Sequence, residues 1–179
     1  DGHGPASITM TQTAYRRLEY PGAGLGEDGW RVLTYSQLRA LNRPYGRRPP
    51  TRQFDLHLTG NMHKFVWGFD GKTWSESDMI RFQYGERLRI NMVNDTMMSH
   101  PIHLHGMWMD LYAGGNMTNN PRKHTVIVQP AELLTVDITA DAPGQWAFHC
   151  HLLYHMEAGM FRTVAVVRSL KGGPIHAEG

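Results

Sequence analysis

The chain has 179 residues, of which 41% are apolar, and its formal net charge is +2. This length and apolar content allow one sizeable hydrophobic core. No run of about 18 apolar residues occurs, so we expect no membrane span, and the arginines of "RPYGRRPPTR" (residues 43–52) lack the aromatic platform of a nucleic-acid site and indicate a solvated linker.

The first fifty residues differ in composition from the rest, because they are rich in Gly, Pro and Arg. We expect residues 1–50 to form an extended arm or interdomain connector. It contains one short helix in "TYSQLRAL", where Thr34 or Ser36 caps and Leu38 and Leu41 share a face. The chain opens with "DGHGPAS", which has no basic and apolar leader, so we expect an export signal to be absent or already removed.

Residues 51–170 predict an all-β domain, followed by a flexible tail over 171–179. "RQFDLHLTG" places Phe54, Leu56 and Leu58 on one face of a strand, and "ERLRINMVN" does the same with Leu88 and Ile90. Later runs of this kind are "HTVIVQP", "ELLTVDITA", "GQWAFHCH" and "MFRTVAVVR". Seven or eight such strands fit one Greek-key β-sandwich.

Histidine and methionine are abundant, at eleven residues each, and there is a single cysteine. One cysteine excludes an intrachain disulfide. Imidazole and thioether ligands together suit copper, especially Cu(I). Six of the methionines fall in one window, and core packing is the alternative reading for each of them: Met92, Met97, Met98, Met107, Met109 and Met117. Met117 is the one we consider for a Cu(I) docking surface.

The histidines of "SHPIHLHGMWM" and "FHCH" sort into two sets, because successive side chains of a strand point to opposite faces. In the first block, His103 and His105 share a face and His100 has the opposite parity. In the second, His149 and His151 flank Cys150, which points the other way. We therefore expect His100 to group with Cys150, and the other four histidines to group on the opposite side.

The segment "LLYHMEAGM" can bring two more ligands back toward Cys150 through a short helical turn. His155 and Met160 complete a Cys-x4-His-x4-Met spacing, so that His100, Cys150, His155 and Met160 form a trigonal copper site with a weak axial sulfur. Zinc is a rival for the four-histidine face, but no second thiolate or carboxylate completes a tetrahedral zinc site at Cys150. An electron reaching Cys150 could continue along the backbone to His149 and His151.

These motifs resemble a known family. "HPIHLHG" followed by "HCHLLYHMEAGM" is similar to the C-terminal copper signature of the multicopper oxidases, and "NMHKFVWGFDGKTW" through "MVNDTMMSHPIHLHGMWMDLYAGG" resembles the last cupredoxin domain of the bacterial copper-resistance protein A family. The resemblance implies that His100, Cys150, His155 and Met160 are type 1 copper ligands. It implies a type 2 role for His103 and type 3 roles for His105, His149 and His151.

The sequence departs from the family pattern in its histidine count. A trinuclear cluster takes eight histidines, and the two further His-x-His motifs of the N-terminal domain are not present. The resemblance therefore implies a complete type 1 site and a half-built cluster, which needs N-terminal cupredoxin domains of the same protein or another subunit. Some relatives carry an acid directly after the second type 1 histidine, where this sequence has Met156 followed by Glu157. Some also carry an acid before the Thr-Val of a later strand, where this sequence has His124.

The resemblance implies an enzyme domain. We expect the C-terminal part of a periplasmic copper-resistance oxidase, in which Cu(I) or a small phenol is the reductant and dioxygen is the acceptor. Cys150, His149 and His151 would carry the electron between the sites. A stand-alone type 1 electron carrier and a copper-sequestering protein are the alternatives. We expect His57, His63 and His124 to be hydrogen-bonded or surface histidines.

Overall fold

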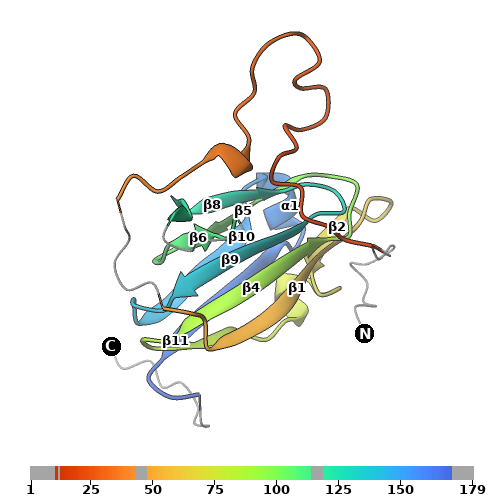
Figure 1. The fold of residues 1–179 in the computed structure, drawn as a ribbon. Coiled ribbons are helices and arrows are strands. Elements are labelled where there is room, and N and C mark those ends of the chain that lie inside the picture. Colours follow the sequence, from red (N-terminus) through yellow and green to blue (C-terminus); the bar gives the residue numbers. More distant parts are fainter. Residues whose placement is uncertain (1–10, 12, 43–47, 114–118, 171–179) are drawn as a thin grey trace.

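The computed structural model describes residues 11, 13–42, 48–113 and 119–170, which form two β-sheets packed face to face (Figure 1). The six-stranded sheet has the order β2 (Val66–Phe69), β1 (Arg52–Asn61), β4 (Arg87–Asn94), β9 (Leu133–Thr139), β6 (Met109–Leu111), β7 (Arg122–Lys123). The five-stranded sheet has the order β3 (Ile80–Gln83), β11 (Phe161–Val167), β10 (Gly144–Cys150), β5 (His100–Leu104), β8 (Thr125–Val128). The expected tail, residues 171–179, lies outside the described part of the chain.

Both sheets mix parallel and antiparallel pairs. β1 runs parallel to β4 and β3 runs parallel to β11, whereas the other ladders are antiparallel. The helices are short: the 3-10 turns η1 (Tyr35–Gln37) and η2 (Trp74–Glu76), and α1 (Leu153–Glu157) after β10. No helix in the described ranges has both the length and the apolar content needed to span a membrane.

The core lies between the sheets and follows from the period-2 alternation of the strands. Leu88, Ile90 and Met92 of β4 are at most 1% exposed and meet residues such as Ile102 and Phe148 of the opposite sheet in one cluster. Burying a Leu, Ile or Phe side chain fully stabilises the fold by roughly 1.5–3 kcal/mol. The all-β prediction is confirmed. The structure has eleven strands in its described part, more than expected, because β3, β6 and β7 have only two to four residues and show little alternation.

The N-terminal arm closes the edge of the sandwich that β8 would otherwise leave open. The Tyr35 hydroxyl accepts a hydrogen bond from the Ile127 amide at 2.9 Å, and Leu18 is buried at 8% exposure. A short helix forms within "TYSQLRAL" as the 3-10 turn η1, with Thr34 as its N-cap and the Gln37 side chain accepting the Thr34 N–H. Leu41 is 97% exposed, so the expected apolar face has nothing to pack against.

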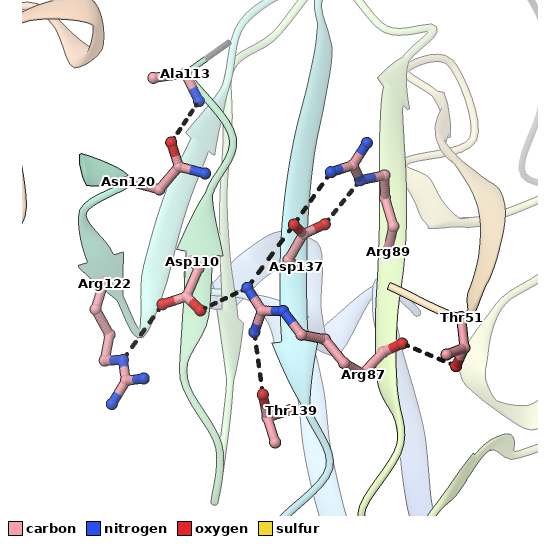
Figure 2. A network of polar contacts seen from close by, with 9 residues as sticks. All are labelled: Thr51, Arg87, Arg89, Asp110, Ala113, Asn120, Arg122, Asp137 and Thr139. Carbon is pink, nitrogen blue, oxygen red and sulfur yellow. Dashed lines mark hydrogen bonds and ion pairs between the residues drawn. The ribbon is translucent and has the colours of Figure 1, made fainter. Parts of the chain in front are cut away.

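The outer face of the six-stranded sheet carries a buried ionic network (Figure 2). Asp137 of β9 accepts two hydrogen bonds from Arg89, at 2.7 and 3.1 Å, and lies 3.8 Å from Arg87. Asp110 of β6 pairs with Arg87 at 3.0 Å and with Arg122 at 3.3 Å. Buried charges are tolerated only when paired in this way. The network therefore ties β4, β9, β6 and β7 together on the face away from the core.

Candidate metal centre

The centre is built on the antiparallel pairing of β5 with β10. The register places Cys150 opposite Ile102 and His149 opposite His103. Residues His100, Ile102 and Leu104 of β5 point into the core, whereas His103 points away from it. Cys150 is fully buried, in the same core cluster as Ile102. The pairing thus separates the two histidine sets onto opposite faces of one sheet.

The buried set consists of His100, Cys150 and His155, whose ligand atoms form a small triangle. Cys150 Sγ lies 3.7 Å from His100 Nδ1 and 3.9 Å from His155 Nδ1, and the two nitrogens are 3.2 Å apart. A circle through three points at these separations has a radius of about 2.1 Å. Zinc sites show metal–nitrogen bonds of about 2.0–2.1 Å and metal–sulfur bonds of about 2.3 Å. One first-row metal ion therefore fits between the three atoms.

Helix α1 returns His155 and Met160 to this cluster. The His155 amide donates to the Leu152 carbonyl at 3.0 Å, the Met160 amide donates to the His155 carbonyl at 2.9 Å, and the Cys150 amide donates to the Met160 carbonyl at 3.1 Å. Met160 is 0% exposed. These backbone bonds hold the loop closed, so that His155 lies beside the thiol and Met160 is paired through its backbone with Cys150.

Burial favours the uncharged forms of the Cys150 thiol and of the His100 and His155 rings. It raises the pKa of the Cys150 thiol to about 11 and lowers the pKa of His100 to about 3, with the neighbouring His155 as a second cause for His100. The pKa of His155 is lowered for the same reason. Two neutral imidazoles and one thiol therefore face each other at pH 7. A bound metal would have to displace the thiol proton, as thiolate ligation requires.

A hydroxyl that the sequence analysis missed orients His100. Thr96 Oγ1 lies 2.7 Å from His100 Nε2, and also 2.9 Å from Asn94 Oδ1 and 3.1 Å from the Met98 carbonyl. Because the last two atoms can only accept, the hydroxyl proton points to one of them and Thr96 accepts from His100 Nε2–H. His100 Nδ1 is then left unprotonated and directed at Cys150. The signal in the sequence was the polar "NDT" directly after an apolar strand.

Trp67 of β2 forms one wall of the buried set. Its ring stacks on His155 with centroids 4.0 Å apart and planes 21° apart, and lies 5.3 Å from the ring of His100. Phe65, which is 52% exposed, lies outside it with its centroid 6.3 Å from His155. The aromatic wall keeps water from the imidazole and fixes its plane. No sequence spacing relates Trp67 to the ligands, so pattern analysis could not find it.

The other four histidines gather on the opposite face of the sheet, as parity predicted. His103 lies with its ring centroid 4.5 Å from that of His105, 5.6 Å from that of His149 and 5.8 Å from that of His151. His105 Nε2 and His149 Nε2 are 3.1 Å apart. His105 and His151 are exposed and His103 is half-buried. This face is open, which suits ligands shared with another domain.

Carbonyl groups orient two rings of the open face. His103 Nδ1 donates to the His124 carbonyl at 2.7 Å, and His149 Nδ1 donates to the Cys150 carbonyl at 2.9 Å. The Nε2 atom of each ring is therefore the one free to bind a metal. Partial burial lowers the pKa of both histidines, which favours the neutral, ligating form.

The remaining histidines have other surroundings. His57 pairs with Asp95 at 2.7 Å, and His63 is exposed. His124 bonds to the Thr125 hydroxyl at 2.8 Å, with its ring 5.3 Å from that of His103.

Met156 is half-buried, and Met117 lies outside the described residues. Gly106, at φ 75°, ends the first block where any side chain would overlap the ring of Trp146.

Comparison with known proteins identifies the family. Residues 47–169 match a family model described as "Multicopper oxidase". The chain belongs to the multicopper oxidase family. It is 52% identical over 150 residues to a copper resistance protein A homolog of Pseudomonas syringae pv. tomato, and 52% identical over 151 residues to copper resistance protein A of Escherichia coli; each match covers 84% of this chain. The chain spans 25% of the length of these relatives.

Solved structures support the fold. The blue copper oxidase of Nitrosomonas europaea superimposes with a TM-score of 0.58 at 21% identity, covering 69% of this chain and 47% of that one. Fet3p, a multicopper oxidase that functions in iron import, gives a TM-score of 0.59 at 17% identity, covering 67% and 32%. The cupredoxin-like sandwich expected from the sequence is thereby confirmed. Membership of the family implies copper as the metal of the site.

The metal-free chain should lose stability in acid. The pKa of His100 is about 3 in the folded state and about 6.5 when unfolded, so the unfolded state binds more protons between these values and stability falls as pH drops from about 6.5 toward 3. At about 1.4 kcal/mol per pH unit, we expect a loss of about 2–3 kcal/mol by pH 4.5. Urea unfolding of copper-free protein at pH 7 and pH 4.5 measures it. His100→Gln should reduce the loss, and an equal loss in this variant and in the exposed control His63→Gln would contradict the assignment.

Removing the Thr96 hydroxyl should loosen His100. Thr96→Val leaves the His100 Nε2–H without its acceptor, so we expect copper affinity to fall about 10–100-fold, the usual effect of losing a group that orients a metal ligand. Competition titration against a copper chelator measures the affinity. Thr96→Ser keeps the hydroxyl and should bind copper as the wild type does. Unchanged affinity in Thr96→Val would show that the hydroxyl does not position the imidazole.

Proposed function

We propose that this chain is the C-terminal, copper-binding domain of a copper-resistance multicopper oxidase that transfers electrons from Cu(I) or a small phenol to dioxygen. The observation that carries the proposal is the placement of two ligand sets on opposite faces of one sheet. His100, Cys150 and His155 form the buried set. The four-histidine face lies directly behind them, because His149 and His151 adjoin Cys150 in the chain.

We assign His100, Cys150, His155 and Met160 as the type 1 copper ligands. Two imidazole nitrogens and one thiolate sulfur in a triangle, with a buried thioether in the same loop, form the donor set of a blue-copper site. Zinc would need a fourth strong donor, and none of the described residues adds a second thiolate or a carboxylate to this group. When bound, copper would supply one-electron chemistry at this position.

The chain itself supplies a short route between the two sets. Cys150 is joined by single peptide links to His149 on one side and His151 on the other. The carbonyl of Cys150 also accepts the His149 Nδ1–H at 2.9 Å. An electron that reaches the Cys150 sulfur therefore has a covalent path to two rings of the open face. This is the basis for proposing a catalytic role for Cys150, His149 and His151.

Reductant should approach from the side of His155. His100 is 0% exposed and bonds to Thr96, whereas His155 is 4% exposed and its ring centroid lies 6.3 Å from that of Phe65, which is 52% exposed. The neighbouring helix α1 is exposed at Tyr154, which is 81% accessible. A small phenol or a Cu(I) complex could contact this rim without entering the core.

The open face is proposed as half of a trinuclear cluster, with His103 as a type 2 ligand and His105, His149 and His151 as type 3 ligands. Four further histidines would come from N-terminal cupredoxin domains of the same protein or from another subunit. This requirement agrees with the fact that the chain spans 25% of its relatives' length. We also propose a periplasmic location, which rests on the resemblance to the bacterial copper-resistance protein A family.

A second candidate, a stand-alone electron carrier, is favoured by one observation. All residues of the buried set come from this chain, whereas a metal held by the exposed His105 and His151 would need further ligands from another domain. A carrier would use the buried set alone. A copper-sequestering protein, in contrast, would bind Cu(I) through methionines without needing Cys150.

Copper content and the visible spectrum test these assignments. The oxidised 179-residue chain should bind about one copper tightly and show an intense blue absorption band, because a thiolate–copper bond forms. Cys150→Ser should abolish the band, and His63→Gln, at an exposed histidine outside both sets, should leave it unchanged. A colourless copper-loaded chain, or Cu(I) binding unaffected by loss of Cys150, would contradict the type 1 assignment.

A further experiment separates the oxidase from the carrier. Supplying the N-terminal domains of the protein in trans should raise the copper count toward about four per complex and start dioxygen consumption. His103→Ala and His151→Ala should abolish consumption while the blue band persists. A blue protein that never consumes dioxygen with these domains would favour the carrier.

A further inference from the structure

The two open edges of the sandwich differ in whether another segment of the chain covers them. The arm covers β8 on one side, whereas on the other side β3 is an edge strand of its sheet. β1 pairs with β2 only from Leu58 onward, so its first half has β4 as its only strand neighbour. A cavity of about 320 Å³ lies at this edge, between β1 of one sheet and β3 of the other, and residues of both sheets line it. We call this edge the second seam. The cavity is separate from both histidine sets.

The cavity contains a buried cation that lacks a counter-ion. Arg162 of β11 is 4% exposed, and its guanidinium donates to the carbonyls of Phe69, at 2.6 Å, and Thr73, at 3.3 Å. Among the described residues, no carboxylate lies within ion-pair distance of it. The buried Arg87, by contrast, is paired with Asp110 at 3.0 Å.

The walls of the cavity divide into an apolar part and a basic part. Phe54 and Leu56 of β1 and Ile80 of β3 form the apolar part, where the core would otherwise meet solvent. Lys72 and Arg81 also line the cavity and are exposed, so they add positive charge to its rim. A ligand with one anionic end and one apolar end would match both parts.

Acidic residues reduce the positive charge without neutralising Arg162. Asp70 and Asp78 also line the cavity, and neither carboxylate lies within ion-pair distance of Arg162. Asp70 accepts the His57 amide at 2.8 Å, and both carboxylates are exposed to solvent. Arg52 is occupied by Glu86 at 2.6 Å. Lys72, Arg81 and Arg162 therefore outnumber the two aspartates.

We propose that this seam is a binding site for a small organic carboxylate with a flat apolar body, held by Arg162 and Arg81 against Phe54 and Ile80. A guanidinium offers five N–H donors in a planar fork that matches a carboxylate, and only two of the Arg162 donors are used by the carbonyls given above. Displacing water from the apolar wall adds to binding. None of the assigned copper ligands lines this cavity.

Benzoate is a suitable probe, because it carries one carboxylate on a ring that fits the cavity volume. Titrating benzoate into the 179-residue chain should shift the NMR amide signals of β1, β3 and the 69–73 turn, with a Kd on the order of 1 mM. At about ten times this concentration, the melting temperature should rise by about 2–5 °C. Benzyl alcohol has the same ring without the charge and should bind at least tenfold more weakly.

Variants locate the site. Arg162→Gln should weaken benzoate binding at least tenfold, and Arg81→Gln, at an exposed position that does not affect folding, should weaken it about threefold. Arg168→Gln removes the same charge outside the cavity and should bind benzoate as the wild type does. Equal binding of benzoate and benzyl alcohol, no binding at 20 mM benzoate, or no weakening in Arg81→Gln and Arg162→Gln would overturn the proposal and leave Arg162 as a support for the 69–73 turn.

Discussion

The antiparallel register of β5 and β10 determines on which face of the sheet six candidate ligands lie: His100, His103, His105, His149, Cys150 and His151. Cys150 stands opposite Ile102, and His149 stands opposite His103. A shift of one residue would turn every side chain of one strand to the other face, so that the thiol would leave the core. The core between the two sheets packs against β5 and β10 and so supports this register. The ionic network on the outer face of the six-stranded sheet holds the strands of that sheet together.

Burial then gives the two sets different chemistry. Inside, the pKa of Cys150 is raised to about 11, so the thiol is protonated and inert until a metal displaces the proton. Outside, His105 and His151 are exposed and can be shared with another domain. One peptide segment therefore joins a closed set of candidate ligands to an open one. This difference agrees with a chain that spans a quarter of its relatives' length.

The sequence predicted the sandwich and the division of histidines because both depend on a period of two, which is visible in the printed residues. It did not predict Thr96 or Trp67, which reach the centre through loop geometry and through a strand of the other sheet. The short helix expected within residues 34–41 is the one-turn 3-10 helix η1, and Leu41, expected on its apolar face, is 97% exposed. The position of Arg162 at the second seam depends on the pairing of β11 with β3, which no local pattern encodes.

The most direct measurement of the central claim is X-ray absorption at the copper edge of the loaded 179-residue chain. The buried triangle predicts two nitrogen neighbours at about 2.0 Å and one sulfur neighbour near 2.3 Å, the bond lengths that metal–imidazole and metal–thiolate contacts adopt. The sulfur neighbour should disappear in Cys150→Ser. A first shell of nitrogen and oxygen alone in the wild-type chain would place copper outside the His100, Cys150 and His155 triangle and contradict the account.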